Sequence, residues 1–144
     1  MRFRHVGITV SDLEKMLFFY RDLLGYKIHK QALEEGRFID SISNLDNVRV
    51  TTVKMIPENN DMMSMIELLN YHSHKTNLSK LQINNGGITH FALTVEDVNS
   101  VYNKLLQNGI IFNCPPKLSE DGGAIVTFCR DPENNLIELV QEIK

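Results

Sequence analysis

The chain has 144 residues, of which 42% are hydrophobic and 23% charged, a composition typical of a globular protein with one domain or two small modules. A formal net charge of −3, with basic residues scattered along the chain, argues against nucleic acid or an anionic membrane as a partner. The residues after Met1 lack the apolar core of a signal peptide, and no stretch is long enough to span a bilayer. We therefore expect a cytoplasmic protein.

The first predicted elements are a strand and a helix. Residues 5–10 alternate so that His5, Gly7 and Thr9 share one face of a strand, and the apolar side chains share the other. Apolar residues at helical spacing follow over residues 13–24, after a capping-box pattern at residues 11–14 and before the stop signal Gly25. We expect this helix to pack on the apolar face of the strand.

The middle of the chain predicts two further strands. Residues 48–55 have strand character, and the turn at residues 57–60 leads into a buried strand over residues 65–69. Between the first helix and these strands, residues 37–45 predict a short helix or an irregular insert. The polar stretch at residues 72–87 is interpreted as a linker.

The second half repeats the first. Residues 90–95 again place His90, Ala92 and Thr94 on one face of a strand, and a helical pattern runs from residue 98 to Gly109. Residues 124–129 predict a strand, and the turn at residues 132–135 leads into another strand at 136–140, as residues 57–60 do in the first half. The sequence therefore predicts an α+β domain of two βαβββ modules, 1–71 and 88–144, joined by the linker 72–87.

Four side chains at equivalent places in this repeat predict a metal site. Glu67 and Glu138 each lie in the middle of an apolar strand, where a carboxylate needs a cation or metal as a partner. His5 and His90 each begin the polar face of a strand. A single strand histidine is more often structural than a ligand, but the repetition of both residues favours a shared site. If the two polar faces join in one concave sheet, the four side chains converge.

Imidazole nitrogen and carboxylate oxygen suit one divalent Zn, Ni, Co, Fe or Mn ion. Such an ion polarises the carbonyl of a small substrate that chelates it through neighbouring oxygens, and Glu67 or Glu138 could then move a proton.

The other candidate residues and motifs give weaker support for a function. His72 and His74 fit a solvated loop, Cys114 and Cys129 fit reduced thiols without a chemical role, and no nucleotide-binding or serine hydrolase motif is present.

Five segments together resemble the vicinal oxygen chelate superfamily, which includes glyoxalase I, methylmalonyl-CoA epimerase, extradiol dioxygenases and antibiotic resistance proteins. The resemblance covers essentially the whole chain, and the segments that carry it are residues 5–10, 19–25, 66–68, 89–95 and 131–139. It implies a glyoxalase-like fold, in which two βαβββ modules form an eight-stranded open sheet around the metal. It also implies a homodimer that acts on a small molecule.

Within that superfamily, we expect a metal-dependent lyase, isomerase or epimerase that shifts a proton. The fourth ligand, Glu67, favours redox-neutral chemistry over an iron-dependent extradiol dioxygenase, and the complete ligand set favours an enzyme over a non-catalytic resistance protein. Both alternatives remain open. Glyoxalase I has an Asn-Trp-Gly segment after the equivalent glutamate, whereas this chain has Leu69-Asn70-Tyr71 and no tryptophan.

Overall fold

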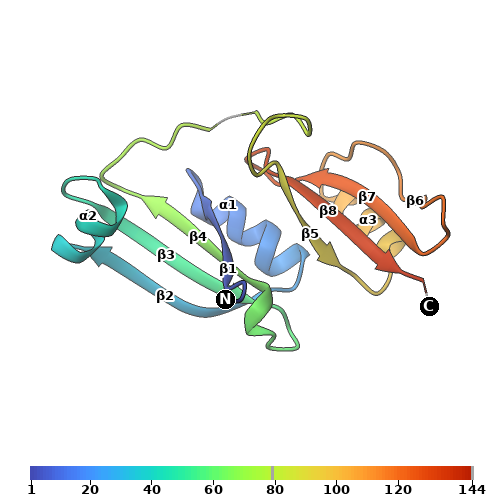
Figure 1. Ribbon diagram of the computed structural model, residues 1–144, viewed down its shortest axis with the longest axis horizontal. Coiled ribbons are helices and arrows are strands. Elements are labelled where there is room, and N and C mark those ends of the chain that lie inside the picture. Colours follow the sequence, from blue (N-terminus) through green and yellow to red (C-terminus); the bar gives the residue numbers. More distant parts are fainter. Residues whose placement is uncertain (79, 144) are drawn as a thin grey trace. The chain divides into compact units, whose positions relative to one another are not determined.

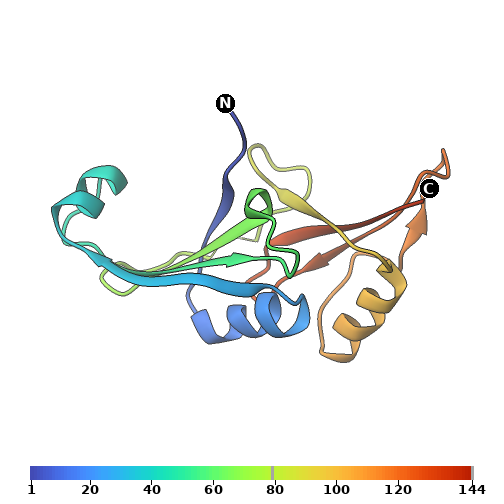
Figure 2. The same cartoon turned by 90° about the horizontal axis from the view of Figure 1, so that it is seen from below.

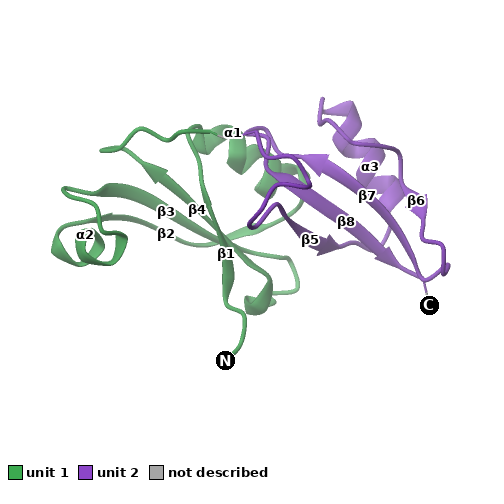
Figure 3. Cartoon of the chain, turned by 45° about the horizontal axis from the view of Figure 1, so that its top comes forward, with its two compact units in different colours: residues 1–78 green, residues 79–144 purple. Residues whose placement is uncertain are grey.

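The computed structural model describes residues 1–78 and 80–143, and the chain divides into two compact units, residues 1–78 and 79–144 (Figures 1 and 3). Two residues lie outside the described part of the chain. They are Ser79, in the predicted linker, and Lys144, at the end of the predicted second module. Each unit contains one four-stranded sheet with helices.

The first unit contains, in chain order, β1 (His5–Thr9), α1 (Leu13–Leu17) with its π-helical continuation η1 (Phe18–Leu23), β2 (Lys27–Glu35), α2 (Arg37–Ser43), β3 (Arg49–Ile56), the 3-10 turn η2 (Met62–Ser64) and β4 (Met65–Tyr71). The second contains β5 (His90–Thr94), α3 (Val98–Gln107), β6 (Lys117–Leu118), β7 (Ala124–Arg130) and β8 (Leu136–Glu142). The predicted α+β class with two βαβββ modules is confirmed.

The two sheets have the same topology. Their strand orders are β1-β4-β3-β2 and β5-β8-β7-β6, with the first pair in each parallel and the others antiparallel. The parallel pairing brings the first and last strands of each module side by side. Segments some sixty residues apart in the first module thus become neighbours. This pairing is what can bring a histidine near a glutamate.

One face of each sheet is apolar and carries a helix. In the first unit Ile8, Leu68 and Val53 lie in one row across three strands and are all buried, and the buried side chains of α1 and η1 belong to the same core. In the second unit, α3 contacts β7 and β8 through a face that buries Val98 and Leu105. Figure 2 shows α1 and α3 each lying along one side of its own sheet. The opposite face of each sheet, here called the open face, carries the histidine and glutamate.

The helix boundaries follow the predicted signals with one correction. Asp12, rather than Ser11, caps the first helix, because its carboxylate accepts a hydrogen bond from the Lys15 backbone N–H at 3.1 Å. The stop signals are confirmed: Gly25 and Gly109 adopt φ angles of 79° and 78°, a conformation that glycine reaches without a steric penalty.

The insert at residues 37–45 is helical, and it lies on the open face of the first sheet. Ile39 of α2 forms a buried cluster with Val48 and Val50, and Leu69 and Tyr71 pack against that cluster. Because Val50 pairs with Tyr71 across β3 and β4, α2 covers one end of the open face, beyond Glu67. The described part of the second unit contains no helix between β6 and β7.

No helix in the part of the chain that the structure describes is long and apolar enough to cross a membrane. Both cysteines are free thiols, with Cys129 buried on β7 and Cys114 half-buried outside any strand, as predicted. Met65 is buried, whereas Met62 and Met63 are more exposed, and all three line a surface pocket of about 300 Å³.

Candidate metal centre

In the first unit, His5 and Glu67 come together on the open face. Glu67 lies directly opposite Gly7 in the β1–β4 register, so the missing side chain at Gly7 leaves space between Glu67 and His5. The His5 Nε2 atom is 3.1 Å from the Glu67 Oε2 atom. Glu67 is only 8% exposed, which agrees with the prediction that this carboxylate needs a partner.

The other oxygen of Glu67 faces a lysine. Lys54 lies opposite Glu67 in the β3–β4 register, and its Nζ atom is 3.4 Å from the Glu67 Oε1 atom. Both oxygens of this carboxylate are therefore held, one by His5 and the other by Lys54. The lysine also places a positive charge on the open face next to the candidate ligands.

The second unit repeats the first pair at the same register. Glu138 lies opposite Ala92 in the β5–β8 pairing, and the His90 Nε2 atom is 3.7 Å from the Glu138 Oε2 atom. The Nδ1 atom of His90 is 3.1 Å from the Thr89 hydroxyl, a contact that orients the ring with Nε2 toward Glu138. Where the first unit has Lys54, the second has Phe128, whose ring lies edge-on to His90 with centroids 5.3 Å apart.

The residues present fit a divalent transition metal. Imidazole and carboxylate are suitable donors, and two carboxylates would balance the charge of a divalent ion. The Nδ1 atom of His5 is buried and has no hydrogen-bond partner within the described residues, an unsatisfied state that native proteins usually avoid outside functional sites. Within residues 1–78 and 80–143, no three His, Cys, Asp or Glu side chains gather in one place. The structure thus presents two His/Glu pairs, and the four-residue site stays a prediction.

The sequence of residues 2–139 matches the model of the Glyoxalase/Bleomycin resistance protein/Dioxygenase superfamily. The chain belongs to this superfamily. It is 30% identical over 138 residues to a probable lactoylglutathione lyase of Synechocystis sp.. The alignment covers 95% of this chain and 92% of the relative. It is 25% identical over 141 residues to a lactoylglutathione lyase of Arabidopsis thaliana, but spans only 44% of that protein's length.

The fold of this glyoxalase superfamily member is also that of solved relatives. A crystal structure of a glyoxalase family protein from Bacillus cereus superposes with a TM-score of 0.88, covering 100% of this chain and 95% of the other. The sequence identity is 21%, so the likeness establishes the fold alone.

Sequence reasoning missed Lys54 in this glyoxalase superfamily chain. The signal was weak, because the strand at residues 48–55 also contains Arg49, Thr51 and Thr52, so a lysine there does not stand out as the two glutamates do. Its counterpart, Phe128, is not charged, so the repeat that singled out the other four residues gave no help. Lys54 makes the surroundings of the first His/Glu pair chemically different from those of the second.

Proposed function

We propose that His5, Glu67, His90 and Glu138 together bind one divalent metal ion, Zn, Ni, Co, Fe or Mn. The observation that carries the proposal is the identical register of the two pairs: in each unit the glutamate lies opposite a small residue two positions after the histidine. Independent structural histidines and glutamates have no reason to share that arrangement. The unsatisfied Nδ1 atom of His5 supports the same conclusion.

The proposed reaction is a proton shift on a small substrate with two neighbouring oxygens, catalysed as a lyase or an isomerase. When bound, the metal would polarise the substrate carbonyl and acidify the adjacent C–H bond. Glutamate then removes the proton and returns it at another atom. Relatives named lactoylglutathione lyases support this class of reaction over oxygen-dependent chemistry. We place the protein in the cytoplasm, as a homodimer, within the same proposal.

Of the two glutamates, Glu138 is the better candidate for the mobile base. Glu67 contacts His5 at 3.1 Å and Lys54 at 3.4 Å, one through each oxygen. Glu138 faces His90 at the longer distance of 3.7 Å, and its side chain is 24% exposed compared with 11% for Glu67. A carboxylate that must move between metal and substrate needs this freedom. Glu67 would then anchor the metal.

Metal content tests the shared site. Purified protein should contain about one transition metal per chain, and His5→Ala and His90→Ala should each lower this content, because the three ligands that remain bind the ion more weakly than four. His29→Ala is the matched control, since this exposed histidine on β2 is outside the proposed ligand set. Full metal occupancy in His5→Ala would contradict the proposal.

Isotope exchange tests the reaction. Metal-loaded protein in deuterated buffer should exchange the α-proton of a 2-oxo acid, an acyl-CoA or the hemithioacetal of methylglyoxal and glutathione, and Glu138→Gln should slow the exchange by about 100-fold or more. Glu67→Gln should instead lose the metal. Oxygen consumption with a catechol after Fe²⁺ loading would show a dioxygenase, and stoichiometric binding without exchange would show a binding protein.

A further inference from the structure

A pocket of about 220 Å³ lies in the first unit, at the end of the open face that α2 covers. Its floor is formed by Thr9 of β1 and Tyr71 of β4, which are on the same face of the sheet as Glu67. Its walls are Leu45, which follows α2, and the segment 74–77, which follows β4. The pocket and the metal-site carboxylate therefore share one face.

The strand register sets the distance between them. Thr9 is two residues beyond Gly7, the neighbour of Glu67, so it lies about 7 Å from the level of that carboxylate. Tyr71 is four residues beyond Glu67, about 13 Å along β4. A molecule chelated by the metal would therefore reach the pocket with a tail of several bonds.

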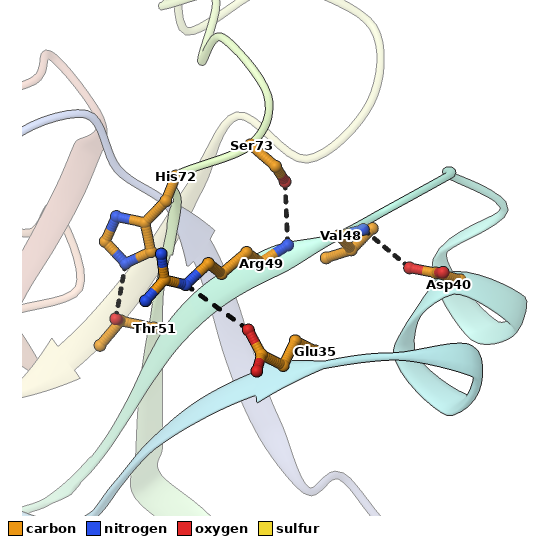
Figure 4. Close-up of polar contacts among 7 residues, drawn as sticks. All are labelled: Glu35, Asp40, Val48, Arg49, Thr51, His72 and Ser73. Carbon is orange, nitrogen blue, oxygen red and sulfur yellow. Dashed lines mark hydrogen bonds and ion pairs between the residues drawn. The ribbon is translucent and has the colours of Figure 1, made fainter.

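Hydrogen bonds to β3 and α2 hold both walls in place (Figure 4). The Asp40 carboxylate accepts from the Val48 backbone N–H at 2.7 Å, which fixes the loop that contains Leu45. On the other side, the Arg49 backbone N–H donates to the Ser73 hydroxyl at 2.9 Å, and Thr51 bonds to His72 at 2.7 Å. These bonds fix the loop that contains Leu45 and the start of the segment that forms the other wall.

The lining combines the apolar surfaces of Leu45 and Tyr71 with polar side chains and one fixed positive charge, that of Lys75. Lys75 and His74 lie on the wall, Thr9, Thr76 and Asn77 add hydrogen-bonding groups, and none of the described residues that line the pocket is acidic. The His74 ring is oriented by its Nδ1 contact with Ser73 at 2.8 Å and by its edge-on position against Tyr71. Such a lining suits an anion of carboxylate or phosphate type.

We propose that this pocket binds an anionic tail of the substrate, about 7 to 13 Å from the metal-binding carboxylate. The inference rests on the proposed metal-dependent function and narrows its substrate class to 2-oxo acids or related chelating compounds that carry a second, distal anion. The α2 insert supplies one wall of this pocket. The selection of substrates with an anionic tail is therefore a property of the first unit.

Binding of matched ligands tests the proposal. Calorimetry with Zn²⁺-loaded protein compares 2-oxosuberate with 2-oxooctanoate, which have the same chain length but a charged or an apolar end. The charged tail should bind about tenfold more tightly. A phosphonate-ended analogue of the same length distinguishes the two anions: a further gain indicates phosphate, and weaker binding than 2-oxosuberate indicates carboxylate.

Two variants and a control assign the preference to the pocket. Lys75→Gln should reduce the tenfold preference to about twofold or less, whereas Lys80→Gln, also an exposed lysine after β4, should keep it. Leu45→Trp should fill the pocket and weaken 2-oxosuberate binding without changing pyruvate binding. A wild-type protein that does not distinguish the two tails, or a preference that survives in Lys75→Gln, would overturn the subsite.

Metal analysis of the same samples distinguishes a failure of the proposed metal site from a failure of the proposed subsite. Protein that binds no Zn²⁺ contradicts the metal site, and the subsite falls with it. Protein that holds Zn²⁺ but ignores the tail charge contradicts the subsite alone.

Discussion

Gly7 lies directly opposite Glu67, on the edge strand β1 of the first sheet. A Cβ atom at Gly7 would meet the Leu69 Cδ1 atom at 3.5 Å, an ordinary van der Waals distance. The second unit already has Ala92 at the equivalent place, opposite Glu138. The backbone therefore tolerates a methyl group here.

We predict that Gly7→Ala stabilises the protein by about 0.5 kcal/mol, because alanine loses less backbone entropy than glycine in a strand. Metal content should not change. Gly7→Leu should keep the fold but lower metal affinity, since a large side chain would occupy the space between His5 and Glu67. Urea unfolding and metal titration measure the two effects, and a loss of more than about 1 kcal/mol in Gly7→Ala would contradict the prediction.

We predict that the protein loses stability at alkaline pH because of the buried thiol of Cys129. Burial, helped by the nearby Asp131 carboxylate, raises the pKa of the Cys129 thiol from 9.0 to about 12. A raised pKa in the folded state stabilises the fold below pH 9, and this stabilisation is lost as the pH rises from 9 toward 12. The free energy of unfolding should fall by about 1 kcal/mol between pH 9 and 10 from this group.

The matched variants for this effect are Cys129→Ala and Cys114→Ala. The first is less stable at neutral pH, because it leaves a small cavity, but it should lose the part of the alkaline slope that the buried thiol contributes. The second leaves Cys129 in place and should keep the slope of the natural protein. Urea midpoints measured from pH 7 to 10 give the comparison. Equal slopes in all three proteins would rule out Cys129 as the cause.

At the level of single residues, the repeat in the sequence identified the two histidines and two glutamates and their pairing within each unit. It could do so because the strand period of two and the parallel register act alike in both modules. The repeat did not identify Lys54, Tyr71 or Lys75, because none of these residues has an equivalent in the other half. Their importance comes from register and from the α2 insert, which depend on long-range packing.

Helix α2 shows how an element's role depends on its contacts rather than its composition. Ile39 is 7% exposed and packs on Val48 and Val50, whereas Ile42, three residues further along α2, is 63% exposed. Ile39→Ala should cost about 2 to 3 kcal/mol of stability, because it leaves a cavity in this cluster. Ile42→Ala should cost less than about 0.5 kcal/mol. Thermal unfolding of the two variants measures the difference, and equal losses would show that α2 does not depend on this cluster.

The elements with strong periodicity were predicted from the sequence, whereas two strands with weak patterns were not located. The strands at the ends of each module and both helices agree with their apolar patterns. Strand β2 was not located, because nearly all its side chains are exposed and its sequence alternates poorly. Strand β6 has only two residues, too few for any pattern. The π-helical turns of η1 also have no signature in the apolar spacing.

For the whole molecule, the sequence predicts two equivalent modules, and the structure confirms their common topology. The convergence of the two His/Glu pairs requires a particular packing of the modules. Residue patterns within each module cannot specify that packing, since every described His/Glu contact lies inside one unit. The shared metal is therefore a hypothesis about the whole molecule, and it predicts behaviour that neither module would show alone.

A metal bound by both units must couple their stabilities. Excess Zn²⁺ at about 100 times its dissociation constant should stabilise the native protein by about 2.7 kcal/mol, which corresponds to a rise of roughly 5 to 10 °C in Tm, and chelation should reverse it. Hydrogen exchange should slow together in β4 of the first unit and β8 of the second. In His90→Ala the metal should no longer protect β4, although the substitution is in the other unit. Protection of β4 that persists in His90→Ala would mean that the first unit binds metal without the second unit's histidine.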